Sequence, residues 1–215
     1  TIIYSILDER FGVVSAPFLF DSLDEVDAAF AREGGKMLDE LLLEKNVVAL
    51  GYGENGFRQI TNNEGPIESP EDLKGMKMRI PGIKMYTDLF RAYGSDPATM
   101  TWSEVFTALQ QGTIDGQENP IDVIYSSKID EVQDYLTLWN YSYDPLVLGI
   151  NKKLFDSMSE EDQELFKRLG KEAAAYQIQL NRERAAEQLE ELKAKGMQVN
   201  ELTEEQLQVF KDASQ

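Results

Sequence analysis

Residues 69–82 read Ser-Pro-Glu-Asp-Leu-Lys-Gly-Met-Lys-Met-Arg-Ile-Pro-Gly, and this stretch indicates the class of fold. Ser69 can cap a one-turn helix, the proline after it suits the first helical position, and Gly75 ends the turn. Residues 76–80 then alternate apolar and basic side chains, as a half-buried strand does, before a Pro-Gly pair breaks the strand. A helix that runs directly into a short strand is typical of an α/β fold.

The rest of the chain repeats this alternation of helices and strands, with a glycine-rich turn over 53–57 after the first long strand. The helical pattern that begins at Ser159 continues to Lys195, over about 36 residues or about 54 Å. Because one compact domain of this size is narrower, we expect that helix to project or to lie across two lobes. The predicted strands are 47–52, 76–80, 114–120, 136–139, 147–150 and 197–199. The predicted helices are 21–42, 85–93, 101–112 and 159–195, and two further helices are predicted to begin at Pro120 and at Thr203.

Composition excludes several classes of function. The 215 residues include 21 Lys and Arg against 39 Asp and Glu, a net charge of −18, which argues against binding to nucleic acid or to an anionic membrane surface. The sequence has no Cys and no His, so it can form no disulfide, Ser-His-Asp triad, His-ligated zinc site or iron–sulfur cluster. We expect no cofactor, although the composition does not exclude a calcium site with oxygen ligands. No apolar run approaches the roughly 20 residues of a membrane span.

Three polar residues near predicted strand ends are candidate ligand contacts. Arg79 lies where ligands gather in open α/β sheets, and its planar guanidinium matches a carboxylate; the alternative is a surface ion pair. Arg58 follows the glycine-rich turn, where the backbone can approach a ligand closely, or it belongs to an ordinary surface turn. Asn119 can donate to one ligand oxygen and accept from a hydroxyl, or it caps the helix that starts at Pro120.

Acidic and aromatic residues give weaker indications. Asp115 and Glu118 are three positions apart and so face opposite sides of a strand, which argues against paired acid and base catalysis. Trp102 can stack on a ligand or fill the core, and the polar aromatic stretch with Asn140 and Tyr143 suits a pocket wall or a hinge. Polar groups are plentiful, but the sequence contains no nucleophile–base pair of a familiar kind. The sequence therefore favours binding over turnover and predicts that the protein is not an enzyme.

Several longer motifs surround these candidates. They are Gly56–Arg58, Pro66–Ile67, Ser69–Arg79, Glu104–Gly112 and Asp115–Pro120, with Pro17–Phe20 and the long C-terminal helix. In order and separation they resemble one known family, the DctP-type substrate-binding proteins of TRAP transporters. The resemblance covers nearly all of the 215 residues.

The resemblance implies an α/β, two-lobed, periplasmic-binding-protein-like fold, with a ligand cleft between the lobes and the long C-terminal helix bracing both. Lobe I is expected to comprise 1–57 plus 145–184, and lobe II to comprise 58–144 plus 185–215. The implied function is capture of a small organic acid, with a weak preference for a sugar acid, and its delivery to TRAP membrane permease subunits. A ligand-sensing ectodomain of the same fold and a His-free enzyme acting on a small acid are the alternatives.

The same resemblance implies roles for particular residues. Arg79 matches the arginine that clamps the carboxylate, and Asn119 matches its partner in the cleft. Arg58 matches a second basic residue near the ligand. The full ligand-binding set expected from the sequence is Arg79, Asn119, Arg58, Trp102, Tyr143, Asn140 and Glu118, with no catalytic and no metal-binding residue.

The beginning of the chain departs from the family pattern. Thr1 opens the sequence with neither an initiator Met nor a signal peptide. Family members carry a further N-terminal stretch before the motif Pro17–Phe20, and it supplies the first strands and helix of lobe I. We therefore expect lobe I to be incomplete in this chain. The family implies a periplasmic or extracytoplasmic location, with lipid anchoring and the identity of the acid left open.

Overall fold

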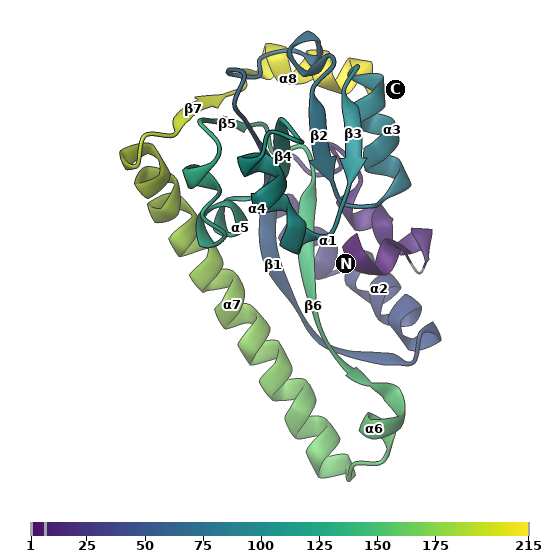
Figure 1. The fold of residues 1–215 in the computed structure, drawn as a ribbon. Helices are drawn as coiled ribbons and strands as arrows, with labels where there is room; N and C mark the ends of the chain where they lie inside the picture. Colours follow the sequence, from purple (N-terminus) through teal and green to yellow (C-terminus); the bar gives the residue numbers. More distant parts are fainter. Residues whose placement is uncertain (1, 7, 215) are drawn as a thin grey trace. The chain divides into compact units, whose positions relative to one another are not determined.

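The computed structural model describes residues 2–6 and 8–214, and the chain divides into two compact units. Two long elements, strand β1 (Val47–Asn62) and helix α7 (Glu160–Ala194), supply residues to both units (Figure 1). Unit 1 consists of Thr1–Gly56 and Ser142–Glu183, and unit 2 consists of Phe57–Tyr141 and Arg184–Gln215.

Unit 1 places helices around the first part of β1 and its partner strand β6 (Tyr143–Asn151), which pairs with it. Apolar side chains of η2 and α2 form its core, and Val47 and Val147 pack against them from the two strands. The helices of this unit, besides α7, are η1 (Ile2–Ile6), η2 (Glu9–Ser15), α1 (Leu23–Phe30), α2 (Glu33–Glu44) and α6 (Lys152–Asp156).

Unit 2 contains a sheet with the strand order β3-β2-β4-β1-β5-β7. Strand β2 is parallel to β3 and to β4, β1 is antiparallel to β4 and to β5, and β7 is parallel to β5. The strands besides β1 are β2 (Lys77–Ile80), β3 (Asp96–Thr99), β4 (Gly116–Pro120), β5 (Tyr135–Leu138) and β7 (Gln198–Glu201).

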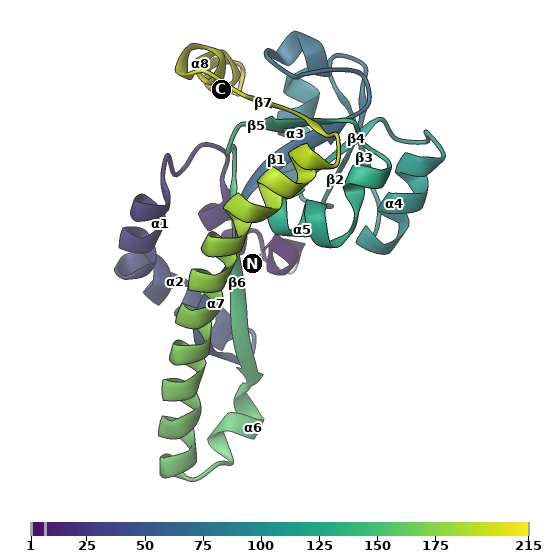
Figure 2. The same ribbon diagram turned by 90° about the vertical axis from the view of Figure 1, so that its left-hand side faces the viewer.

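Helices α4 and α5 lie side by side in unit 2 (Figure 2) and share one apolar core with β5 and the last turns of α7. A second cluster is aromatic and joins α3 to α8, with Tyr93 and Phe210 in edge-to-face contact at 5.2 Å between ring centroids. The helices of this unit, besides α7, are η3 (Pro70–Leu73), α3 (Lys84–Ala92), α4 (Trp102–Gln110), α5 (Ile121–Ser126), η4 (Ile129–Glu131) and α8 (Glu204–Ala213).

Locally encoded features agree with the sequence predictions. Helices η3, α4 and α8 begin with capping boxes, in which the N-cap side chain and the residue three positions on satisfy each other's backbone N–H groups. Helix α7 runs unbroken for 35 residues, about 52 Å, as the pattern over 159–195 predicts. Gly196 follows with a φ of 108°, a conformation that ends a helix and favours glycine.

Two predicted boundaries are wrong, and each has its own structural reason. The helix predicted over 21–42 divides after Phe30, because the backbone of Arg32, with φ −117° and ψ −130°, leaves the helical region before α2 begins at Glu33. The glycine-rich turn over 53–57 does not exist, since β1 continues to Asn62. Gly53 instead lets α7 approach β1, because an added Cβ would lie 2.6 Å from Gln177 Oε1.

The sheet also differs from expectation at three strands. Strand β3 is not among the predicted strands. It contains Pro97, and it is the edge of the sheet, where a missing N–H is tolerated. Strand β6 starts at Tyr143, four residues before the predicted start. Strand β2 is not half-buried: it lies between β3 and β4, and its last three side chains, including Arg79, are all buried.

Replacing Gly51 by alanine is expected to lower the free energy of unfolding by about 1–3 kcal/mol, because overpacking forces neighbours apart. Helix α7 packs closely on β1 at this position, and an added Cβ would lie 2.7 Å from the Gly170 carbonyl oxygen and 2.8 Å from Ala174 Cβ. Urea unfolding measures the loss. Gly65→Ala is the matched control, since nothing lies within 4 Å of a Cβ there; equal stability of the two variants would contradict the packing argument.

Candidate ligand-binding site

Arg79 lies near the carboxyl end of β2 and is only 7% exposed. Its Nε–H and Nη2–H both donate to the carbonyl oxygen of Met100, at 3.3 and 3.0 Å. Its guanidinium carbon lies 5.3 Å from the centroid of the Trp102 ring, a cation–π distance. Backbone and ring together hold the guanidinium in one orientation.

No ion pair involves Arg79 within residues 2–6 and 8–214, and in that part of the chain its Nη1 group has no hydrogen-bond partner. Burial is the largest influence on its pKa and lowers it from the ordinary value, while the Glu118 carboxylate raises it and Arg58 lowers it further. Arginine nevertheless stays protonated in proteins. A buried cation without a paired carboxylate is unfavourable on its own, so this geometry suits an incoming anion.

Arg58 and Glu118 form a buried ion pair, with side chains 3% and 0% exposed. The Nε–H of Arg58 donates to Glu118 Oε2, and its Nη2 group donates to Glu118 Oε1 at 2.9 Å. The Tyr141 hydroxyl also donates to Glu118 Oε2, at 2.7 Å, and burial followed by the charge of Glu118 raises the pKa of Tyr141. Because Glu118 balances Arg58, Arg79 is left without a carboxylate partner among the residues that the structure describes.

Asn119 joins this cluster through the Arg58 Nη2 group, which donates to Asn119 Oδ1 at 3.1 Å. Its own Nδ2 group donates to Gln117 Oε1 at 2.7 Å. The alternative role as a helix cap is wrong, since Pro120 is the N-cap of α5 and the Asn119 side chain is bonded to Arg58 and Gln117 instead. Asp115 accepts from the Lys77 backbone N–H instead of facing Glu118, which agrees with the expectation that the two carboxylates do not converge.

The remaining predicted residues are distributed over both units. Asn140 is exposed in unit 2, has a φ of 47°, and accepts a hydrogen bond from Gln59 Nε2 at 2.6 Å. Tyr143 belongs to unit 1, where its hydroxyl donates to Glu54 Oε2 at 3.1 Å and burial raises its pKa. Direct contacts join Arg79 to Trp102, and Arg58 to both Glu118 and Asn119. Asn140 lies in the same unit and is bonded to Gln59, while Tyr143 lies in unit 1.

Sequence reasoning missed the polar side chains that support this cluster. The Oε1 atom of Gln59 accepts hydrogen bonds from the backbone N–H groups of Trp139 and Asn140, at 2.9 and 3.2 Å. Gln117 and Thr61 are buried beside it on β4 and β1. A signal was present, since polar residues stand two positions apart on each strand, at 59 and 61 and at 117 and 119, where apolar residues would otherwise fill a core.

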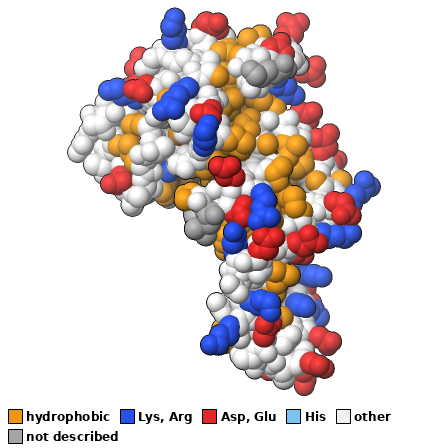
Figure 3. All heavy atoms as spheres, turned by 90° about the vertical axis from the view of Figure 1, so that its right-hand side faces the viewer, with side chains coloured by type: hydrophobic (Ala, Val, Ile, Leu, Met, Phe, Trp, Pro, Cys, Tyr) orange, Lys and Arg blue, Asp and Glu red, His pale blue; other side chains and the backbone are white. Residues whose placement is uncertain are grey.

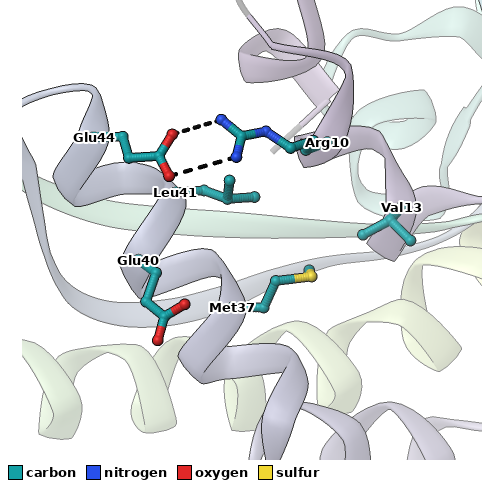
Figure 4. A pocket seen from close by; sticks show the side chains of 6 residues that line it. All are labelled: Arg10, Val13, Met37, Glu40, Leu41 and Glu44. Atoms are coloured by element: carbon teal, nitrogen blue, oxygen red, sulfur yellow. Dashed lines mark hydrogen bonds and ion pairs between the residues drawn. The ribbon is translucent and has the colours of Figure 1, made fainter.

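A hollow of about 360 Å³ in unit 1 is a poorer candidate (Figure 4). Among the described residues that line it, one is basic: Arg10, which is half exposed and already paired with Asp8 and Glu44 at 2.7 and 2.5 Å. None of the residues predicted to bind a ligand lines it. The lining residues are Arg10, Val13, Met37, Glu40, Leu41 and Glu44.

Three further observations concern the described residues. On the face drawn in Figure 3, Lys and Arg side chains are interspersed with Asp and Glu rather than gathered into one patch. Within the described residues, no three His, Cys, Asp or Glu side chains are arranged to hold a metal ion, and no helix is long and apolar enough to cross a membrane.

Comparison with known proteins places the chain in a family. Residues 2–215 match the family model of the bacterial extracellular solute-binding proteins, family 7, known as DctP, and the chain belongs to this family. The resemblance stated from the sequence motifs is thereby confirmed.

Two curated relatives illustrate the family. The 2,3-diketo-L-gulonate-binding periplasmic protein YiaO of Escherichia coli K12 is 36% identical over 202 residues, covering 94% of this chain and 61% of that protein. The C4-dicarboxylate-binding periplasmic protein DctP of Rhodobacter capsulatus is 31% identical over 199 residues, covering 92% and 60%. The chain therefore spans about 60% of the length of these relatives.

Solved structures agree with the fold. A TRAP periplasmic solute-binding protein from Sulfitobacter sp. NAS-14.1, with bound β-D-galacturonate, has a TM-score of 0.94 at 32% identity and covers 98% of this chain and 69% of that one. The sugar acid binding protein DctPAm from Advenella mimigardefordensis, in complex with galactonate, has a TM-score of 0.92 at 35% identity and covers 97% and 67%. The expected fold class, that of the TRAP solute-binding proteins with a long C-terminal helix, is confirmed.

Proposed function

We propose that this protein is the solute-binding component of a TRAP-type transporter and captures a small organic acid outside the cytoplasm for delivery to membrane permease subunits. The observation that carries the proposal is the buried guanidinium of Arg79, which has no carboxylate partner in the described chain and is oriented by Met100 and Trp102. A planar guanidinium of this kind binds a carboxylate through two parallel hydrogen bonds. Relatives that carry gulonate, galacturonate, galactonate and succinate support a carboxylate as the ligand.

The finer parts of the proposal concern location, chemistry and movement. Two curated relatives are named as periplasmic proteins, and this supports an extracytoplasmic location. We propose binding without turnover, because the family consists of solute-binding proteins and the described side chains around Arg79 include no nucleophile–base pair. The lobe boundaries expected from the sequence, 1–57 with 145–184 and 58–144 with 185–215, stay a prediction; they differ by one to three residues from the two compact units, and Tyr143 falls in unit 1. Closure of two lobes on the ligand through Arg79 and its neighbours is part of this proposal, as is a contact from Tyr143.

A thermal-shift panel on the full-length gene product tests the proposal. We expect at least one of galactonate, galacturonate, gulonate and succinate to raise the melting temperature by a few degrees, since ligand at 100 times its dissociation constant adds about 2.7 kcal/mol. Mass spectrometry of the recovered ligand should find it unchanged. Stabilisation by neutral sugars alone would contradict the carboxylate, and a chemically altered ligand would contradict binding without turnover.

A further inference from the structure

A chain of side-chain hydrogen bonds runs from Asn119 into the interior of unit 2. Asn119 Nδ2 donates to Gln117 Oε1 at 2.7 Å, and Gln117 Nε2 donates to Thr61 Oγ1 at 2.9 Å across the β1–β4 pairing. The Thr61 hydroxyl donates to Gln133 Oε1 at 3.0 Å, and Gln133 Nε2 donates to two backbone carbonyl oxygens. All four side chains are buried.

The two ends of this chain determine its direction. At one end, the Arg58 guanidinium can only donate, so the oxygen of the Asn119 amide must face it. At the other end, the carbonyl oxygens of Asp115 and Val132 can only accept, so the nitrogen of the Gln133 amide must face them. If the Gln117 amide or the Thr61 hydroxyl were reversed, a donor would face a donor or an acceptor would face an acceptor. Each buried polar group that is left without a hydrogen bond in this way costs about 1–3 kcal/mol.

This direction determines what Asn119 offers to a ligand. Its Nδ2 group carries two N–H donors, of which Gln117 takes one. The second N–H has no partner among the residues that the structure describes, and the amide cannot rotate to present its oxygen instead. Asn119 therefore presents a donor, and a ligand must place an acceptor opposite it.

We propose that Gln117, Thr61 and Gln133 are positioning residues that hold Asn119 as a hydrogen-bond donor and thereby select ligands with a carboxylate, hydroxyl or carbonyl oxygen at that point over ligands with an ammonium group. The inference rests on the proposed function, because it assigns a role to Asn119 in the same site. None of the three positioning residues needs to touch the ligand.

Two substitutions of Thr61 separate positioning from packing. Thr61→Val keeps the shape of the side chain but removes the hydroxyl, so Gln117 loses its acceptor and only the Arg58 end still holds the Asn119 amide in its orientation. Thr61→Ser keeps the hydroxyl and removes a methyl group. Calorimetric titration with galactonate, galacturonate, gulonate and succinate should show about tenfold weaker binding by the valine variant for the acid that wild type binds, and less than twofold change for the serine variant.

The outcomes are distinct. Valine and serine variants of equal affinity would overturn the inference, because a packing role does not depend on the hydroxyl. Failure of wild type to bind any of the four acids would count against the proposed function instead. The inference is then tested without ligand, by NMR of the Asn119 side-chain amide: we expect its N–H exchange and rotation to be faster in Thr61→Val than in wild type and Thr61→Ser, and equal rates in all three would overturn it.

Discussion

Replacing Arg79 by lysine is expected to weaken binding of the organic acid by about 2–4 kcal/mol, roughly 30- to 1,000-fold. The positive charge remains, but lysine cannot donate two parallel hydrogen bonds to a carboxylate while also holding the Met100 carbonyl oxygen, as the arginine does at 3.0 Å. Stacking on Trp102 is lost as well. Isothermal titration calorimetry on folded protein measures the change.

The matched control for this variant is Arg91→Lys, because Arg91 is an exposed arginine in the last turn of α3. It should leave both affinity and stability unchanged, since surface substitutions rarely alter stability by more than about 0.5 kcal/mol. A loss below about 0.5 kcal/mol for Arg79→Lys, similar to that of the control, would remove Arg79 from the ligand-binding role.

Replacing Arg58 by methionine is expected to lower the free energy of unfolding by about 3–5 kcal/mol, as breaking a buried ion pair does. Glu118 is fully buried, and in this variant it must either keep its charge without a guanidinium or take up a proton. The Tyr141 hydroxyl, its other hydrogen-bond donor, carries no charge to replace the one lost. Urea unfolding at neutral pH measures the loss.

The double variant Arg58→Met/Glu118→Leu isolates the pairing. It removes both charges and substitutes apolar groups, a change that is often neutral or even stabilising for buried pairs. We expect it to be more stable than Arg58→Met alone. If the double variant is instead as unstable as the sum of the two single variants, the two side chains are not coupled and the account of this ion pair is wrong.

Features that depend on a few neighbouring residues could be predicted from the sequence. The capping boxes at Ser69, Thr101 and Thr203 need only the side chain three positions further along, and all three form. The continuity of α7 likewise follows from a local pattern. The family could be recognised because its motifs lie in order along nearly the whole chain.

Features that depend on partners distant in the sequence could not be predicted from it. Residues 53–57 have the composition of a turn. The strand continues through them because Gln177 of α7, more than a hundred residues away, packs against Gly53 and bonds to the next backbone N–H. Arg79 is buried because β2 has neighbours on both sides, and no local pattern reveals that. Arg58 and Arg79 looked alike in the sequence, and the ion pair with Glu118, 60 positions from Arg58, distinguishes them.

The central claim is that a carboxylate is held by Arg79, and the most direct test compares each acid with a neutral molecule of the same carbon skeleton. Galactonate is titrated beside galactitol, galacturonate beside galactose and succinate beside butane-1,4-diol, on the full-length protein by calorimetry. For the acid that binds, we predict at least 100-fold tighter binding than for its neutral partner, since a charge-assisted pair with a buried guanidinium is lost in the neutral molecule. Affinities within threefold of each other, or tighter binding of the neutral molecule, would contradict the account.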